Sequence, residues 1–336
     1  MNERVNEPLL DIENLGVELP RHDRRGARRT VIQGVTLSVA PGEAVGVVGE
    51  SGSGKSMTAR AVLRLLPAGA TVTGHIGFQG RSVLGLSRRE LADYRSRRVS
   101  MIYQDPRAHT NPLRTIADFL TEGVVACGDM SRDEAAEAGC ALLRDVGVSD
   151  PERRMTQYPH QLSGGLLQRM MIVMALLPSP DLVLADEPTT ALDVTVQSEV
   201  MAILAEQIRE RSLGLLFITH DLDLAAAVTD TLAVMYAGTI VEIGPAAAVY
   251  AGPAHPYTAA LLASRPSPFS VKRIAAIPGR PIAAFEAGDG CVFAARCPYA
   301  TDQCRTQRPL ARPVAGRSVA CHRAEDLESA LRAMVS

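Results

Sequence analysis

Short apolar runs, each five or six residues long, recur along the chain and predict buried strands. Such runs occupy 44–48, 99–103, 181–186 and 214–219. Alternating apolar positions predict further strands at 8–19, 30–39 and 71–79, and a hairpin over 231–243 around Ala237-Gly238. Helical patterns predict helices at 57–66 and 196–211, the second of them amphipathic, and a polar helix at 88–98. Strands that alternate with helices favour an α/β fold with a mainly parallel sheet.

The pattern of apolar and polar positions changes twice along the chain. From residue 111 to 177 strand signals vanish, and helical spacing runs through 112–125, 132–146 and 164–177. We interpret about 105–177 as a helical insertion in the α/β core. After Ser264 frequent prolines break the pattern, so we divide the chain into a domain of 1–264 and a loop-rich C-terminal tail of 265–336. We expect something other than a hydrophobic core to hold this tail together.

Charge and composition exclude several classes of protein. The formal net charge is −2 at pH 7, which gives no electrostatic case for a nucleic-acid partner. The Arg-rich stretch 21–29 is typical of a solvated loop. The first residues lack the apolar core of a secretory signal, and the longest uncharged stretch, 243–264, contains three prolines. We therefore expect a chain that is soluble by itself in a reducing cytoplasm.

A glycine-rich stretch follows the strand at 44–48 and reads Gly49-Glu50-Ser51-Gly52-Ser53-Gly54-Lys55-Ser56. Glycines let the backbone curl so that successive N–H groups point inward, and the helix that begins near Met57 adds its dipole. Only two of the 35 basic residues are Lys, and one of them is Lys55. The pattern predicts a triphosphate site in which Lys55 reaches the terminal phosphates and Ser56 ligates Mg²⁺.

Polar residues follow three of the other buried strands. Asp186 and Glu187 end one strand, His220 follows another and Gln104 leaves a third. The carboxyl edge of a parallel sheet is where ligands bind. We expect Asp186 to coordinate Mg²⁺, Glu187 to polarise an attacking water, His220 to contact the γ-phosphate and Gln104 to reach both metal and water.

A second predicted anion site begins at Leu162-Ser163-Gly164-Gly165-Leu166-Leu167-Gln168. Here a Ser and two Gly start a helix, as they do in a helix N-terminus that binds an anion. One chain cannot easily fold two such sites onto one triphosphate. We therefore infer that this second site closes on a nucleotide held by another subunit.

Together these motifs resemble the nucleotide-binding subunit of an ATP-binding cassette (ABC) transporter, whose core is a P-loop NTPase fold with an antiparallel β subdomain. In family order they are Walker A (49–56), the Q-loop (Gln104), the signature (162–168), Walker B (182–187), the D-loop (Ala191-Leu192-Asp193) and the switch histidine (His220). The stretches 101–106, 158–160, 185–197 and 255–258 and the cysteine-bearing tail resemble the peptide-importer branch, which includes nickel systems.

The resemblance implies a motor that hydrolyses ATP with Mg²⁺. Two ATPase subunits would pair head to tail, and each ATP would touch Walker A of one chain and Ser163, Gly164, Gly165 and Gln168 or their equivalents of the other. In this branch the second ATPase is commonly a different chain, which implies a heterodimer. Two transmembrane permease subunits and an extracellular or periplasmic substrate-binding protein would complete the importer, with this chain on the cytoplasmic face of the membrane.

Two departures from the family pattern concern single residues. Leu166 stands where the signature often has Gln, but the Ser and Gly donors are present. The aromatic residue that usually stacks on adenine is missing after the first strand, where Leu19, Pro20, Arg21 and His22 stand instead.

Four cysteines lie in the tail, at Cys291, Cys297, Cys304 and Cys321, with five, six and sixteen residues between them. Four thiolates close together suggest a metal site, and the lack of a pair separated by two residues makes zinc less natural. By resemblance to related peptide-importer ATPases we expect a [4Fe-4S] cluster; zinc, free thiols and disulfides stay open. Cys127 and Cys140 fall on helical patterns, and we expect them to be buried.

Other functions fit part of the same pattern. The chain could serve a nickel or other solute importer, or act on a soluble partner such as DNA or ribosomes, but it has no coiled-coil insertion or tandem cassette. A degenerate cassette that binds ATP without hydrolysing it is disfavoured by Glu187 and His220.

Overall fold

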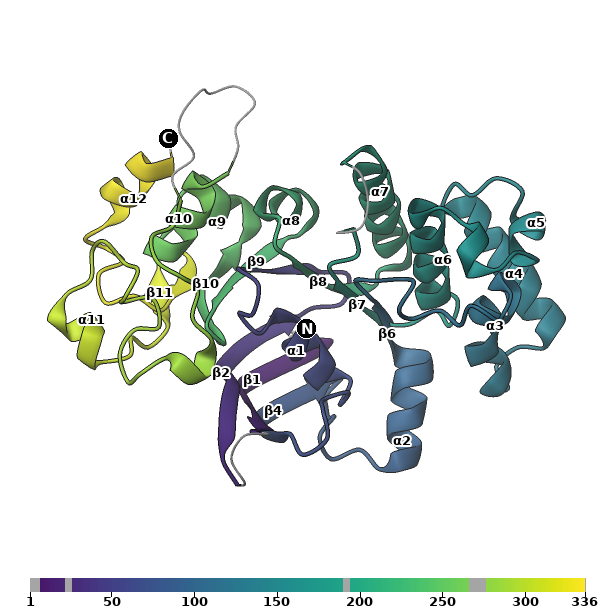
Figure 1. Ribbon diagram of the computed structural model, residues 1–336, viewed down its shortest axis with the longest axis horizontal. Coiled ribbons are helices and arrows are strands. Elements are labelled where there is room, and N and C mark those ends of the chain that lie inside the picture. Colours follow the sequence, from purple (N-terminus) through teal and green to yellow (C-terminus); the bar gives the residue numbers. More distant parts are fainter. Residues whose placement is uncertain (1–6, 22–25, 190–193, 266–275, 336) are drawn as a thin grey trace, which may run out of the picture. The chain divides into compact units, whose positions relative to one another are not determined.

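The computed structural model describes residues 7–21, 26–189, 194–265 and 276–335 (Figure 1). These residues form two compact units. One unit contains 40–43 and 85–217, and the other contains 10–39, 44–84 and 218–336 except the undescribed residues. The phosphate loop and the tail therefore belong to the same unit.

An antiparallel sheet opens the phosphate-loop unit. Its strand order is β2-β1-β4-β5, with β1 (Leu10–Pro20), β2 (Arg28–Val39), β4 (Thr71–Phe78) and β5 (Arg81–Ser82). Apolar side chains alternate along β1 and β2 as expected, and Ile12, Val17 and Ile32 are fully buried. This sheet is the antiparallel β subdomain.

A second set of strands in this unit carries the phosphate loop. Its order is β11-β12-β10-β9-β3, with β3 (Ala44–Val48), β9 (Thr231–Tyr236), β10 (Thr239–Pro245), β11 (Arg312–Val314) and β12 (Arg317–Val319). β3 pairs with β9 in parallel, with Val45 opposite Thr231. β9 and β10 form the predicted hairpin, whose turn places Ala237 and Gly238 at positive φ. The helices of this unit are α1 (Lys55–Val62), α8 (Leu222–Val228), α9 (Ala246–Ala251), α10 (Pro256–Ala263), α11 (Asp302–Thr306) and α12 (Glu328–Val335).

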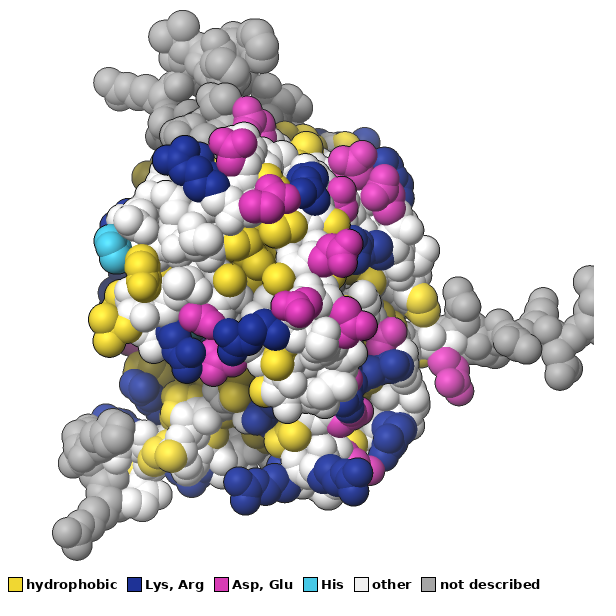
Figure 2. Space-filling model, turned by 90° about the vertical axis from the view of Figure 1, so that its right-hand side faces the viewer, with side chains coloured by type: hydrophobic (Ala, Val, Ile, Leu, Met, Phe, Trp, Pro, Cys, Tyr) yellow, Lys and Arg dark blue, Asp and Glu magenta, His cyan; other side chains and the backbone are white. Residues whose placement is uncertain are grey.

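The other unit joins parallel strands to the helical insertion. β6 (Val99–Ile102) pairs in parallel with β7 (Leu182–Asp186), and β8 (Gly214–Thr219) follows β7 in the sheet. The helices are α2 (Arg88–Asp93), continued by a π-helix over Tyr94–Arg98, then α3 (Ile116–Ala126), α4 (Arg132–Asp145), α5 (Pro151–Met155), α6 (Gly164–Leu176) and α7 (Val194–Arg211). Figure 1 shows α3, α4 and α6, in teal, packed beside one another. On the face shown in Figure 2, basic and acidic side chains are interspersed, with hydrophobic side chains between them.

The tail is built differently from the sequence-based expectation. Its described residues, 265 and 276–335, contain two short strands, two α-helices and a 3-10 helix over Ala284–Glu286. Val319, Phe293 and Leu331 are 0–1% exposed. β12 extends the sheet by pairing with β10, where Glu242 lies opposite Val319. α12 packs on α10 through Leu331 and Ala259. The expectation that something other than a hydrophobic core holds the tail was therefore wrong, because its apolar side chains are buried against elements of the preceding 264 residues.

Candidate nucleotide site

The phosphate loop lies between β3 and α1, as the sequence predicts. All three of its glycines have backbone angles that side chains disfavour: φ is +154° at Gly49, +79° at Gly52 and +108° at Gly54. A Cβ at Gly49 would lie 2.1 Å from the carbonyl oxygen of Met235, so no larger residue fits there. Lys55 is buried, and its ammonium donates hydrogen bonds to the carbonyls of Gly49 (2.7 Å) and Glu50 (3.1 Å). The loop is thus a folded, glycine-dependent turn with its lysine inside.

Two residues that sequence reasoning did not identify contact this loop at Glu50. The hydroxyl oxygen of Tyr257 accepts a hydrogen bond from the Glu50 N–H at 3.0 Å. The Arg296 guanidinium forms two hydrogen bonds with the Glu50 carboxylate, at 2.6 and 3.1 Å. Because 207 and 246 residues separate these partners from Glu50, no local sequence pattern reports them.

The other unit brings together two of the predicted catalytic residues. The Gln104 amide, which follows β6, donates a hydrogen bond to Glu187 Oε2 at 2.9 Å. Glu187 follows β7 and has a φ of 47°, in the left-handed region that non-glycine residues rarely adopt. Asp186 is 4% exposed at the end of the same strand. The Glu187 carboxylate thus sits on a strained backbone and accepts a hydrogen bond from the Gln104 amide. A carboxylate held in this way is a suitable general base for a bound water.

His220 belongs to the phosphate-loop unit and follows the last residue of β8. Its side chain is exposed, and the next residue, Asp221, caps α8 by accepting a hydrogen bond from the Leu224 N–H at 3.0 Å. The start of α8 therefore fixes the backbone on which His220 is carried.

Ser163 caps α6 in the unit of the helical insertion. Its hydroxyl accepts a hydrogen bond from the Leu166 N–H at 3.3 Å, and Gly164 and Gly165 form the first turn. Ser163 is exposed, so this helix N-terminus faces solvent. Gln168 is only 1% exposed and therefore lies beneath this surface.

Two of the predicted positions fall outside the described residues. These are the D-loop residue Asp193 and His22, one of the residues considered for adenine. Leu19, another of that group, is buried at the end of β1.

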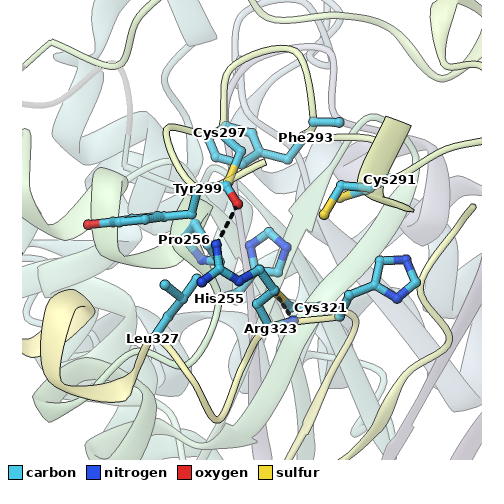
Figure 3. Close-up of a pocket in the computed structure, with 12 residues that line it drawn as sticks. His255, Pro256, Cys291, Phe293, Cys297, Tyr299, Cys321, Arg323 and Leu327 are labelled. Carbon is cyan, nitrogen blue, oxygen red and sulfur yellow. Dashed lines mark hydrogen bonds between the residues drawn. The ribbon is translucent and has the colours of Figure 1, made fainter. Parts of the chain in front are cut away.

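The four tail cysteines line one cavity together with His255 and Phe293, and Figure 3 shows Cys291, Cys297 and Cys321 converging on it from separate segments. All four thiols are free. Burial raises the pKa of Cys297 and of Cys321 to about 11, so both are protonated at neutral pH. Within the described ranges, no group of three or more His, Cys, Asp or Glu side chains is placed to hold a metal ion. The donor set is therefore gathered around one cavity without forming a preorganised ligand cage.

The cysteines of the helical insertion differ from the expectation. Cys127 is exposed because it caps the C-terminal end of α3, and Cys140 is only partly buried. The prediction that both are buried was wrong.

Comparisons with known proteins identify the family. The ABC transporter family model matches residues 32–190, and the model for the C-terminal region of oligopeptide/dipeptide transporters matches residues 241–304. A protein of Sinorhizobium fredii named a probable peptide ABC transporter ATP-binding protein is 42% identical, over 95% of this chain and 96% of its own length. The oligopeptide transport ATP-binding protein OppD of Escherichia coli is 41% identical over 93% of this chain and 92% of its own length. The dipeptide transport ATP-binding protein DppD of Escherichia coli is 39% identical over 94% of this chain and 96% of its own length.

Solved structures agree on the fold. The ATP-binding cassette MJ0796 in a post-hydrolysis state, bound to ADP and Pi, superposes with a TM-score of 0.62 at 24% identity, over 70% of this chain and 98% of its own. The fold is thus that of a cassette ATPase, an α/β P-loop fold, as predicted. The sequence resemblance is also confirmed: the chain belongs to the ATP-binding proteins of ABC transporters, in the oligopeptide and dipeptide branch.

Proposed function

We propose that this chain is the ATP-hydrolysing motor subunit of an ABC importer for dipeptides or oligopeptides. The observation that carries the proposal is the likeness to peptide transport ATP-binding proteins over more than nine-tenths of the chain, tail included. The contact between Gln104 and Glu187 supports hydrolysis as well as binding, because it places an amide against a carboxylate that can polarise water.

We assign the phosphates of ATP to the loop at 49–56, including Glu50, Ser51, Gly52 and Ser53, and to Met57 at the start of α1. Lys55 would then bind phosphate oxygens in place of its two carbonyl partners. An ammonium forms a stronger hydrogen bond to a charged phosphate oxygen than to a neutral carbonyl oxygen. We propose Ser56, Gln104 and Asp186 as the residues that hold Mg²⁺. The ion would neutralise charge on the phosphate oxygens.

For the chemical step we propose that Glu187 accepts a proton from the attacking water while Gln104 orients that water. His220 would donate a hydrogen bond to the γ-phosphate. Ser163, Gly164 and Gly165 would bind the nucleotide of a second ATPase chain, with Gln168 supporting the helix from below and Asp193 contributing from the D-loop. The site would then be complete only in a dimer, so hydrolysis would depend on closure.

A nucleotide site shared between two chains requires partners. We propose a second, similar ATPase subunit, two transmembrane permease subunits and an extracellular or periplasmic substrate-binding protein, with this chain peripheral on the cytoplasmic face of the membrane. Among the helices of the described ranges, none is both long and apolar enough to cross a bilayer. Contact with the membrane would therefore be made through the permease subunits.

The test uses the copurified transporter in vesicles. Peptide-stimulated ATPase activity and peptide uptake should both be present in the wild type and fall at least about 100-fold in Glu187→Gln, because the general base is lost. Binding of ATP should persist in that variant. The matched control is Glu152→Gln, an exposed carboxylate of α5 that pairs with Arg144. If the Glu187 variant kept wild-type turnover, the assignment of the base would be wrong. Stimulation by nickel instead of peptide would reassign the cargo.

We also propose that the four tail thiols bind a [4Fe-4S] cluster. The support is the donor set itself: four free cysteines around one cavity, in the sulfur-only set that such clusters use. Binding would have to release protons from Cys297 and Cys321, so uptake should be favoured at higher pH. No step of ATP hydrolysis is assigned to the cluster.

This proposal is tested on the untagged chain purified without oxygen. About four irons per chain and absorption at about 400 nm are expected, and both should be lost in Cys304→Ser. Cys127→Ser, in an exposed thiol outside the tail, is the control. One zinc per chain, or four thiols that react fully without bound metal, would overturn the assignment.

A further inference from the structure

The tail contacts the phosphate loop at Glu50, whose N–H, carbonyl and carboxylate each have a partner. Its carbonyl accepts from Lys55, its N–H donates to Tyr257 and its carboxylate accepts from Arg296. Two of these three partners lie beyond residue 250. The loop is therefore not held by its own glycine-rich sequence alone.

The pair between Arg296 and Glu50 is a buried one. The Arg296 side chain is 4% exposed and that of Glu50 is 23% exposed. A guanidinium in this setting needs all its donors satisfied, and Arg296 also donates to the carbonyl of Pro278 at 2.8 Å. The two parallel bonds to Glu50 fix direction as well as distance, which a lysine could not do.

Aromatic rings enclose this pair. The ring of Tyr236 lies 4.7 Å from that of Tyr257 and 5.4 Å from that of Phe293, and all three side chains are 0–1% exposed. The Arg296 guanidinium lies 5.7 Å from the Tyr236 ring and 5.9 Å from the Phe293 ring. Phe293 also lines the cysteine cavity, as Figure 3 shows, and Arg296 directly precedes Cys297. The tail thus reaches the phosphate loop through rigid, packed groups.

We propose that Arg296 is a positioning residue for ATP: by clamping Glu50 it holds the phosphate loop in its binding conformation, so an intact tail is required for normal nucleotide affinity. The inference rests on the proposed function of the loop and adds to it a structural dependence on the tail. Loss of the clamp would leave the Glu50 carboxylate without its buried partner, and the loop would move to hydrate it. Nucleotide affinity would fall for that reason, without any change at Gln104 or Glu187.

The experiment measures ATP affinity of the full chain, and KM and kcat of ATPase activity in the copurified transporter. Arg296→Met is expected to raise the KM for ATP about tenfold while kcat at saturating ATP changes less than about twofold. Arg296→Lys keeps the charge but loses the paired bonds, so its KM should lie between wild type and Arg296→Met. The control is Arg280→Met, which breaks an exposed tail ion pair with Glu286 and should leave KM unchanged.

The double variant Glu50→Gln/Arg296→Met separates positioning from general damage to the tail. If Arg296 acts through Glu50, the double variant should be no weaker in ATP binding than the worse single variant. Equal KM in wild type, Arg296→Lys and Arg296→Met would overturn the proposal, as would additive losses in the double variant. Lys55→Ala reports on the proposed function separately: if it binds ATP as well as wild type, the loop is not the nucleotide site and both proposals fall.

Discussion

At the scale of single residues, His255 and Glu242 show how burial changes ionisation in the phosphate-loop unit. Glu242 is fully buried and accepts hydrogen bonds from the N–H groups of Ala254 and His255, both at 2.9 Å. Burial raises the pKa of Glu242. Burial lowers the pKa of His255 from 6.5 to about 3, and its neutral ring accepts the Tyr257 N–H at 3.0 Å.

These shifts predict opposite effects of pH on stability. The depressed pKa of His255 means that the unfolded state binds more protons, so the free energy of unfolding should fall as pH drops below 6.5. The raised pKa of Glu242 means that its contribution to stability is lost as pH rises above 4.5. A comparison of wild type with a variant that cannot titrate at residue 255 isolates the first effect.

His255→Asn keeps an acceptor for the Tyr257 N–H and removes the titration. Between pH 7.5 and pH 5, wild type should lose about 2 kcal/mol of unfolding free energy more than the variant does. Denaturant unfolding at the two pH values measures this difference. Parallel losses in both proteins would show that His255 does not titrate on unfolding.

Sequence reasoning could select the candidate site residues because each follows a buried strand or lies at the start of a helix. Gln104 and Glu187 were expected near one another from that logic alone, and they are hydrogen bonded. Arg296 and Glu242 could not be found in this way. Their partners are distant in the chain, and a lone Arg or Glu in a charged sequence carries no local signal.

At the scale of elements, α6 and α4 of the same unit each begin with a serine cap, and at α4 the Glu134 side chain adds a capping box. Ser163 accepts from the N–H of Leu166, and Ser131 accepts from that of Glu134 at the start of α4, both at 3.3 Å. Removing either hydroxyl should cost about 1 kcal/mol of helix stability. Of these two serines, only Ser163 is proposed to bind a nucleotide.

Ser163→Ala should therefore lower the ATPase activity of the assembled transporter at least about tenfold, whereas Ser131→Ala should leave it near wild type. Both variants should lose similar thermal stability, which makes Ser131→Ala the matched control. Turnover assays and thermal unfolding on the same preparations check this. Equal activity in the two variants would remove Ser163 from the nucleotide site.

The hydrophobic pattern of the sequence predicted helices with one apolar face, such as α4, and short buried strands, such as β7. It missed α9 and α10, whose sequences AAAVYA and PYTAALLA show no polar face to mark a helical period. It also missed β11 and β12. Three-residue strands are too short to show alternation. β12 is specified by pairing with β10 and β11 by pairing with β12, contacts that only the fold supplies.

At the scale of the whole molecule, the tail and the phosphate loop share one compact unit, although the sequence suggested a boundary near Arg265. Arg317, 7% exposed in its side chain, pairs with Glu242 of β10, and Arg296 pairs with Glu50. Cutting at the predicted boundary would remove both of these arginines and leave the two carboxylates without them.

A chain that ends at Ser264 should therefore fail to fold as a soluble ATP-binding protein. The truncation removes β11 and β12, which lie beside β10 in the sheet, and removes Phe293 from the ring cluster around Tyr236. Apolar surface and the unpaired edge of β10 are then exposed. Soluble yield, thermal unfolding and ATP binding of the truncated chain, compared with the full chain and with a chain that lacks only α12, measure this dependence. A truncated chain that melts at the full-chain temperature and binds ATP equally well would show that the first 264 residues fold alone, and that the tail is an independent appendage.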